Sequence, residues 1–464
     1  MTRLLPRALT AIVAAAMAFV WTGPALAISV ARDTEIEEYL WDQVKPVLVT
    51  SGLDPNAVTI YLINDDTFNA FVSGGQNMFI FTGLIDQVDT PNQLLGVMAH
   101  ETGHMAGGHL ARAGGAMTDE ATPFLITMLA GLAAMLAGAG QAGMGIIMGA
   151  QQAMQRAILG YSRVQESSAD QAAITFLDRI HKSGKGMLET FEKLGQQELL
   201  SATMQDPYAR SHPMSRERIA SLEDRVNKSP YVDVPDRPED IARFKLIQGK
   251  VRGFMDDPQT TLRRYPTSDN SDEARYARAV AYYRYPDFTA ANREIDALIA
   301  AHNTNPYFWE LKGQILAEQR DFRGAVKAFD QSVKLKPKAP LLEVNLGATL
   351  FALGDAKQFP HARDVLEDSL RRDPTNAFAW LQLSFIYAEL GNEGMAALAM
   401  AEQRFNMGDY GEAIRFAARA KKLLPAGSRE AGRADDIIVI GQAQDPDDRG
   451  GRNRLNIETQ FTTR

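Results

Sequence analysis

The sequence predicts an α+β protein that is mainly helical, with a mixed helix–strand domain followed by an all-α repeat domain. Short runs rich in β-branched and aromatic residues lie between residues 58 and 81, which is typical of a small sheet. From residue 287 onward a pattern of about 34 residues recurs, which is typical of tetratricopeptide repeats. The chain has 464 residues, too many for one hydrophobic core, since domains usually contain about 100–200 residues. Two or three domains are therefore expected.

The composition is that of a soluble globular protein and argues against a nucleic-acid binder. Hydrophobic residues make up 45% and charged residues 23% of the chain, and the net charge is -8. Such a chain lacks the excess of lysine and arginine with which proteins bind phosphate backbones. The chain has no cysteine, which excludes disulfides and lipid attachment through a thiol.

The N-terminal residues have the layout of a secretory signal peptide. Arg3 and Arg7 precede an apolar run over residues 8–21, and an Ala-Leu-Ala cleavage site ends at Ala27. We expect residues 1–27 to be removed and the mature protein to lie in the periplasm, where a chain without thiols has none to mispair. An uncleaved membrane anchor is the alternative, but the apolar run is shorter than the ~20 residues needed to cross a bilayer.

Residues 28–250 are expected to form the mixed domain. Apolar residues at helical spacing predict a helix over residues 36–49, and residues 58–63 have the composition of a buried strand. Two further short runs, over residues 71–72 and 78–81, flank a glycine-containing turn and predict a hairpin.

A second helix is predicted to begin at Pro91. Thr90 is a typical N-cap, proline is favoured at the first helical position, and Gln93 completes a capping box. The apolar residues that follow carry the helix through Met98 into His100.

Residues 124–150 contain no charged side chain and are long enough to span a membrane. The stretch over residues 138–141, Gly-Ala-Gly-Gln, interrupts this segment and predicts two short helices folded as a hairpin. Each helix is too short to cross a bilayer of ordinary thickness. We expect the hairpin to pack on the first domain, and a hairpin that dips into the membrane is the alternative.

Residues 251–425 are expected to form the repeat domain. Tryptophan, leucine, glycine and alanine residues fall at repeat positions in three successive passes, which include Trp309, Leu346 and Trp380. A plain helical bundle has the same periodicity and is the alternative. Residues 426–464 have few apolar positions, and we expect them to be a disordered tail.

Residues 100–104 read His-Glu-Thr-Gly-His and lie on the helix predicted to begin at Pro91. Two imidazoles four residues apart share one helical face, so His100 and His104 can bind one zinc ion. Glu101 can take a proton from the water that attacks a peptide carbonyl and pass it to the leaving amine. The pattern therefore predicts a metallopeptidase site with one Zn²⁺ per chain.

A catalytic zinc ion usually has a third protein ligand, and two candidates follow in the sequence. His109 lies one residue short of the metzincin spacing and would point away from His100 on a continuous helix. The glycine pair at 107–108 can end that helix early, so the role of His109 stays open. Glu166 and Asp170 share one face of a later predicted helix, where Glu166 can bind zinc and Asp170 can accept a hydrogen bond from a ligand histidine. A solvated acidic face is the alternative.

Together these two motifs resemble the gluzincin metallopeptidase family that includes HtpX and the CaaX prenyl proteases. Residues 161–170, which read Tyr-Ser-Arg-Val-Gln-Glu-Ser-Ser-Ala-Asp, follow the histidine pair as in that family. The signal peptide and the repeats are similar to those of its periplasmic, BepA-type members. The resemblance implies a zincin-type metallopeptidase domain, with His100, His104 and Glu166 as zinc ligands, Glu101 as catalytic base and Asp170 as the partner of a ligand histidine.

The same resemblance indicates a substrate strand and a further histidine. Residues 69–84 are similar to the family's active-site edge strand, to which an extended substrate adds by main-chain hydrogen bonds. This implies substrate contacts at Asn69, Phe71, Met78 and Ile80. Residues 211–213, which read Ser-His-Pro, are with Arg218 similar to the family's histidine–proline region near the metal. From its chemistry alone, His212 could stabilise the developing oxyanion, occupy the open zinc position and hold the enzyme idle, or be an ordinary loop residue.

The resemblance implies an endopeptidase for unfolded or misassembled envelope proteins, in outer-membrane protein quality control and assembly. A concave array of repeats is suited to protein partners, which we expect to be substrates or a larger protein-assembly machine. Two alternatives stay open. One is a chaperone or scaffold with a latent metal site, and the other is a membrane-embedded protease that uses the hairpin over residues 124–150.

Overall fold

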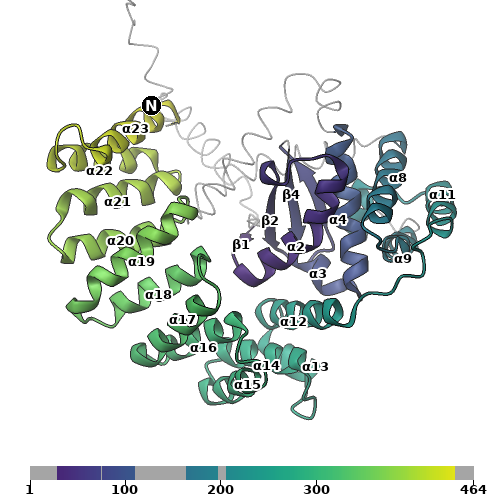
Figure 1. The fold of residues 1–464 in the computed structure, drawn as a ribbon, viewed down its shortest axis with the longest axis horizontal. Helices are drawn as coiled ribbons and strands as arrows, with labels where there is room; N and C mark the ends of the chain where they lie inside the picture. The colour runs from purple at the N-terminus through teal and green to yellow at the C-terminus, as the bar shows by residue number, and fades with distance from the viewer. Residues whose placement is uncertain (1–28, 75, 110–162, 197–204, 445–464) are drawn as a thin grey trace, which may run out of the picture.

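The computed structural model describes residues 29–74, 76–109, 163–196 and 205–444 (Figure 1). The expected signal peptide over residues 1–27 and the expected hairpin over residues 124–150 lie outside the described residues. Within the described ranges no helix is both long enough and apolar enough to cross a membrane. Helices dominate, and one small sheet lies in the first part of the chain, which confirms the predicted helical α+β class.

The sheet has four strands in the order β1-β2-β4-β3. Strand β4 lies between β2, with which it is parallel, and β3, with which it forms an antiparallel hairpin. The predicted strand and hairpin are therefore confirmed, whereas β1, antiparallel to β2, had no prediction. The strands are β1 (Ser29–Ala31), β2 (Thr59–Asn64), β3 (Ala70–Ser73) and β4 (Asn77–Phe81).

One face of this sheet packs against helices to form the core of the first domain. Leu62, Met78 and Ile80 are at most 2% exposed and lie in one cluster with apolar residues of α2 and α4. Figure 1 shows α8, α9 and α11 beside α4, on its side away from α2. The helices are α2 (Thr34–Ser51), α3 (Thr82–Gln87), α4 (Pro91–Ala106), α8 (Arg163–Arg179), α9 (Lys185–Gly195), α10 (Pro207–Ser211) and α11 (Arg216–Asn227), with the 3-10 turn η1 (Pro55–Ala57).

Helix α4 begins and ends where its sequence signals predict. The Thr90 side chain accepts a hydrogen bond from the backbone N–H of Gln93, and Pro91 is the first helical residue. Gln93 Oε1 in turn accepts from the backbone N–H of Asp89 at 2.7 Å, one residue before the N-cap. The helix stops at Ala106, because Gly107 caps it and the next glycine has a φ of 59°.

Helix α12 (Pro238–Met255) joins the two halves of the chain, and it places the domain boundary differently from the prediction. The expected boundary at residue 250 falls inside this continuous helix. Phe244, Ile247 and Val251, spaced by three or four residues, are at most 2% exposed. Since α12 packs on α3 and α4 as well as on α14, it belongs to both domains.

The remaining helices form successive antiparallel pairs, which confirms the repeat prediction. Several of them begin at an Asp or Asn whose side chain accepts from the helix, such as Asp287, Asp321 and Asn392. Figure 1 shows the pairs as an arc whose hollow side faces β1 and α2. The helices are α13 (Pro258–Arg264), α14 (Asp272–Arg284), α15 (Phe288–Ala301), α16 (Pro306–Glu318), α17 (Phe322–Leu335), α18 (Pro340–Ala352), α19 (Phe359–Arg372), α20 (Ala377–Glu389), α21 (Glu393–Asn406), α22 (Tyr410–Leu423) and α23 (Arg429–Gln444), with the 3-10 turn η3 (Ala356–Gln358).

The expected disordered tail is wrong over residues 429–444, which form α23. Ala434 and Ile437 are fully buried against apolar residues of α21 and α22. Small and aliphatic residues spaced by three or four positions make this helix amphipathic, although its overall polarity is high. Residues 445–464 lie outside the described residues.

A buried cluster of charges ties the start of α2 to the repeat domain. Lys250 is 4% exposed, and its ammonium lies 2.7 Å from Asp33 Oδ2 and 3.1 Å from Glu35 Oε2. The Tyr276 hydroxyl donates to the same Glu35 oxygen at 2.7 Å. Because buried charges are costly unless they are paired, this cluster holds the two domains in one arrangement.

Candidate metal centre

Helix α4 places His100, Glu101 and His104 in the interior of the first domain. All three side chains are fully buried. The two histidines are one helical turn apart, so their rings project to the same side, and their Nε2 atoms lie 3.0 Å from each other. The structure thus gives the helical motif the geometry that its spacing predicts.

Helix α8 brings Glu166 and Asp170 against the same face of α4. A Cβ atom at Gly103 would lie 2.7 Å from the Ala169 carbonyl oxygen, so only glycine at this position allows the two helices to approach so closely. Glu166 Oε2 lies 3.5 Å from His100 Nε2, and its Oε1 lies 3.4 Å from the corresponding atom of His104.

Asp170, one turn beyond Glu166, contacts the other nitrogen of the first histidine. Its Oδ1 lies 2.9 Å from His100 Nδ1, and its side chain is 3% exposed. A carboxylate at this position fixes the orientation of the His100 ring. The lone pair of Nε2 then points away from Asp170, toward His104 and Glu166.

The converging atoms fit a zinc ion. When the His100 ring is neutral, the lone pair at its Nε2 faces Nε2 of His104. Two such acceptor atoms can lie this close together when a cation lies between them. Ligand atoms about 2.0–2.1 Å from a tetrahedral zinc ion lie about 3.3 Å apart. The separations among His100, His104 and Glu166 run from 3.0 to 3.5 Å. Two imidazoles and one carboxylate also form a donor set typical of zinc.

His212 lies in the same cluster. It follows α10, and its Nδ1 is 3.3 Å from His100 Nε2 and 3.1 Å from Glu166 Oε2. Together with His104, these residues offer four ligand atoms that all lie within 4.8 Å of one another. The His212 ring stacks on Tyr208, with centroids 4.5 Å apart. The position therefore suits a fourth ligand better than a loop residue facing solvent.

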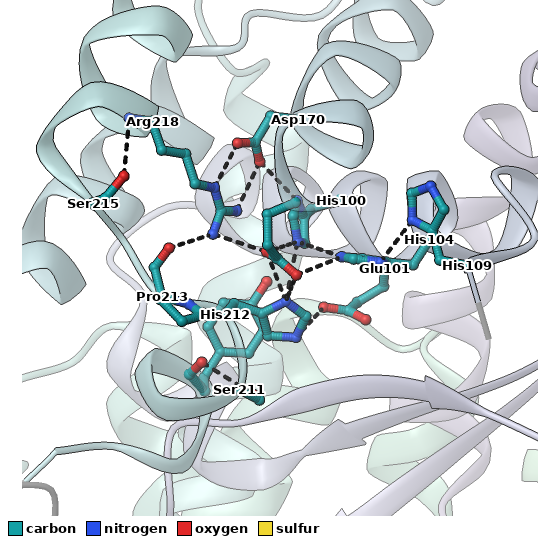
Figure 2. A network of polar contacts seen from close by, with 12 residues as sticks. His100, Glu101, His104, His109, Asp170, Ser211, His212, Pro213, Ser215 and Arg218 are labelled. Atoms are coloured by element: carbon teal, nitrogen blue, oxygen red, sulfur yellow. Dashed lines mark hydrogen bonds and ion pairs between the residues drawn. The ribbon is translucent and has the colours of Figure 1, made fainter. Parts of the chain in front are cut away.

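Glu101 lies on the other side of the His212 ring. Its Oε1 is 3.5 Å from His212 Nε2, so the imidazole stands between the glutamate and the three candidate ligands. Figure 2 shows this arrangement, with the Glu101 carboxylate next to the ring of His212.

Arg218, from α11, joins the two carboxylates of α8 and the loop that carries His212 (Figure 2). Its Nε and Nη2 donate to Asp170 at 2.6 and 2.9 Å, and its Nη1 lies 2.8 Å from Glu166 Oε2. Nη1 also donates to the Pro213 carbonyl at 3.0 Å. A buried guanidinium with this many partners holds both acidic side chains ionised and in place.

His109 contacts a candidate ligand without joining the cluster. Its Nδ1 lies 3.1 Å from His104 Nδ1, on the far side of that ring. The turn at Gly107 redirects the chain, and a Cβ at that glycine would lie 2.4 Å from His109 Nε2. The early end of α4 therefore explains why His109 neither ligates nor points away as it would on a continuous helix.

The proton affinities of these side chains follow from burial and from their neighbours. Burial opposes a charged His100, but hydrogen bonds and charges from Asp170 and Glu166 outweigh it and raise the pKa of His100 to about 9. Burial lowers the pKa of His104 to about 3. Burial also raises the pKa of Glu101 above its usual value. A carboxyl with raised proton affinity suits a group that accepts a proton and returns it.

The structure corrects part of the expected substrate strand. Met78 and Ile80 are fully buried in the core, and β4 is hydrogen-bonded to a strand on each side. These two residues cannot offer a free edge to an extended substrate. Asn69 and Phe71 remain candidates, since they lie just before and within β3, which pairs only with β4 among the described strands.

Two side chains near the centre had no assigned role from the sequence. Arg218 stands six residues after His212, but its partners come from α8, which no local pattern reveals. Tyr208 supports the His212 ring from one turn earlier on α10, and a tyrosine four residues before a histidine is too common to be a signal.

Comparisons with known proteins match both halves of the chain. Residues 34–226 match peptidase family M48, and residues 297–399 match the cytochrome c-type biogenesis protein H TPR domain. The β-barrel assembly-enhancing protease of Escherichia coli (strain K12) is 26% identical over 391 residues, which cover 82% of this chain and 77% of the relative.

Two further relatives agree with this match. A putative β-barrel assembly-enhancing protease of Vibrio cholerae is 25% identical over 419 residues, which cover 88% of this chain and 84% of the relative. The metalloprotease YcaL of Escherichia coli (strain K12) is 31% identical over 168 residues, 36% of this chain and 61% of the relative. The residues that build the metal centre all lie within the segment over residues 34–226.

Proposed function

We propose that this chain is a zinc-dependent endopeptidase of the cell envelope, because residues 34–226 match peptidase family M48. Its substrates are unfolded or misassembled proteins, and its place is in the quality control and assembly of outer-membrane proteins. The observation that carries the peptidase chemistry is the convergence of His100, His104 and Glu166 from two helices. The relatives named β-barrel assembly-enhancing protease support the envelope role, because they match the peptidase segment and the repeats together.

In the proposed reaction, His100, His104 and Glu166 would hold the ion, and Asp170 fixes the orientation of the His100 ring. A zinc ion held there would polarise the scissile carbonyl and lower the pKa of a water molecule beside it. The Glu101 carboxylate accepts the proton of the attacking water and passes it to the leaving amine nitrogen. Burial, which raises the pKa of Glu101, suits it to both steps.

We assign His212 to a resting state in which it would be a further ligand of the ion and exclude the attacking water. The closeness of its Nδ1 to His100 and Glu166 supports this role over oxyanion stabilisation. A catalytic zinc site keeps one position open for water. Cleavage therefore requires the loop with His212 and Pro213 to move away, and the restraint keeps the peptidase idle until then.

The extended substrate is proposed to add to the edge of β3. Asn69 and Phe71 lie at this edge, and main-chain hydrogen bonds to a free strand hold a peptide with little dependence on its sequence. Such loose specificity suits an enzyme for unfolded chains. The repeats hold protein partners, among which we include a larger assembly machine.

The expected export remains part of the proposal. Residues 1–27 would direct the chain to the periplasm and be removed after Ala27. Cell fractionation tests this directly, since the mature chain should be found in the periplasmic fraction with Ile28 at its N-terminus. Recovery of the unprocessed chain in the cytoplasm would contradict it.

A scaffold with a latent metal site is the second candidate function, and the placement of His212 favours it. The two candidates differ in what Glu101→Gln does. The peptidase proposal expects this variant to bind one zinc ion per chain and to lose casein cleavage, while the exposed control Glu192→Gln keeps it. Full rescue of a deletion strain by Glu101→Gln would favour the scaffold, and undiminished cleavage would refute the mechanism.

A further inference from the structure

A large hollow lies on the inner side of the repeat arc, away from the metal centre. It has a volume of about 740 Å³ and runs across the successive inner helices α14, α16, α18 and α20. Arg32 and Asp33, which connect β1 to α2, close one end of it. We call this hollow the repeat groove.

One wall of the repeat groove carries a buried acid. Glu310 on α16 is 7% exposed, and its Oε1 accepts from Asn345 Nδ2 at 3.0 Å. Among the described residues, no cation lies within ion-pair distance of Glu310. The nearby Lys250 pairs with Asp33 and Glu35 instead. Burial without an ion partner raises the pKa of Glu310 to about 8, although the charge of Lys250 opposes this.

The two cations at the same end of the groove, Lys250 and Arg32, are already paired with acidic side chains. One ammonium, that of Lys250, faces the carboxyl groups of Asp33, Glu35 and Glu310. Arg32 is already engaged, with Glu37 at 2.8 Å and with Asp373 at 3.2 Å. A further cation entering here would gain an acid that the described residues leave without an ion pair.

Other parts of the groove wall are apolar or carry amides. Phe254 and Phe378 are 36% and 52% exposed, although large aromatic side chains are usually buried. Gln314 and Asn376 also line the groove. Side-chain amides both donate and accept, so they can hydrogen-bond the main chain of an extended peptide whatever its sequence.

We infer that the repeat groove binds an extended polypeptide segment of a partner protein through a basic side chain, arginine or lysine, that pairs with Glu310. An apolar side chain nearby in the same segment packs on Phe254 or Phe378. A basic side chain favours the ionised form of Glu310 and pairs with it, whereas an acidic segment or a nucleic acid would add negative charge beside the carboxyl groups at the same end. A volume of about 740 Å³ lies in the range typical of ligand sites and holds several residues of extended chain.

The inference concerns the repeat domain and does not need the peptidase chemistry of the proposed function. It is tested in the full mature chain with Glu101→Gln, so that no peptide is cut. The probes are fluorescein-labelled nonapeptides of glycine, serine and threonine, whose central three residues read Arg-Gly-Phe, Glu-Gly-Phe or Arg-Gly-Ser. Fluorescence anisotropy gives the dissociation constant of each.

The Arg-Gly-Phe peptide should bind at least fivefold more tightly than either of the others. Glu310→Gln should remove the preference for arginine over glutamate, and Phe378→Ser should remove the preference for phenylalanine over serine. Glu389→Gln, which deletes an exposed acid at the end of α20, should leave both preferences unchanged. Equal binding of the three peptides, or a preference for arginine that survives Glu310→Gln, overturns the inference. The comparison among peptides stands even where a variant fails to fold.

Discussion

Replacing Asp170 by asparagine should weaken zinc binding through an atom that never touches the ion. The oxygen of the substituted side chain can still accept from His100 Nδ1, but the amide carries no charge. Its NH₂ group then faces the Nε of Arg218, which now lies 2.6 Å from a carboxylate oxygen. The substitution therefore cannot satisfy both partners. Loss of such a supporting carboxylate lowers metal affinity by roughly 10- to 100-fold, or about 1.4–2.7 kcal/mol.

The zinc dissociation constant of this variant can be measured by competition with a chromophoric chelator. Asp178→Asn is the matched control, because Asp178 also lies on α8 and pairs with an arginine of α11, Arg225, at 2.9 Å. The control touches no candidate ligand and should change the constant by less than about threefold. Equal constants for Asp170→Asn and the unchanged chain, or equal losses in both variants, would show that Asp170 does not support the site.

Four further predictions follow from particular contacts. His212→Ala should raise the initial rate of casein cleavage at least fivefold, and a fall in rate would instead make His212 a catalytic group. His109→Ala should weaken zinc binding by about tenfold, because His104 Nδ1 loses one of its neighbours. An unchanged affinity in the chelator competition would show that His109 has no such role. Lys250→Met leaves the buried carboxylate of Glu35 and the partly buried one of Asp33 without an ion pair, and it should lower the free energy of unfolding by about 3–5 kcal/mol. The exposed Lys228→Met should cost less than about 1 kcal/mol. Similar urea midpoints for the two variants would contradict the buried cluster. The pKa of Glu310 is about 8 in the folded chain and 4.5 in the unfolded chain, so the folded chain binds more protons between these pH values and loses stability as the pH rises through them. The melting temperature should therefore fall between pH 5 and pH 8, and Glu310→Gln should make this fall smaller. An unchanged fall in the variant would count against the raised pKa.

Features fixed by neighbours along the chain could be predicted from the sequence. The start of α4 at Pro91, the shared face of His100 and His104, and the glycine-capped end all depend on residues within one or two turns. The repeats were predictable for the same reason, since each helical pair carries its own apolar pattern and N-cap. Helix α23 escaped prediction because its buried residues are two alanines, one isoleucine and one glycine, and such small side chains form only a weak apolar pattern in a segment rich in charged residues.

Features that depend on long-range pairing could not be derived locally. Strand β4 lies between two strands because β2 pairs with it in parallel, so neither edge of β4 is free. Met78 and Ile80, which lie on β4, are therefore poor substrate contacts. The partnership of Arg218 with the acids of α8 joins residues 48 positions apart in the sequence. Glu166 itself, taken alone, looked like any acid on a helix surface, and the family resemblance singled it out.

We expect one zinc ion to join α4 to α8. An anomalous-difference map from crystals of the metal-loaded chain, collected at the zinc absorption edge, tests it most directly. We predict a single peak within bonding distance of His100 Nε2, His104 Nε2 and a carboxylate oxygen of Glu166. A map with no peak between these helices, or with a peak that excludes Glu166, would contradict the account.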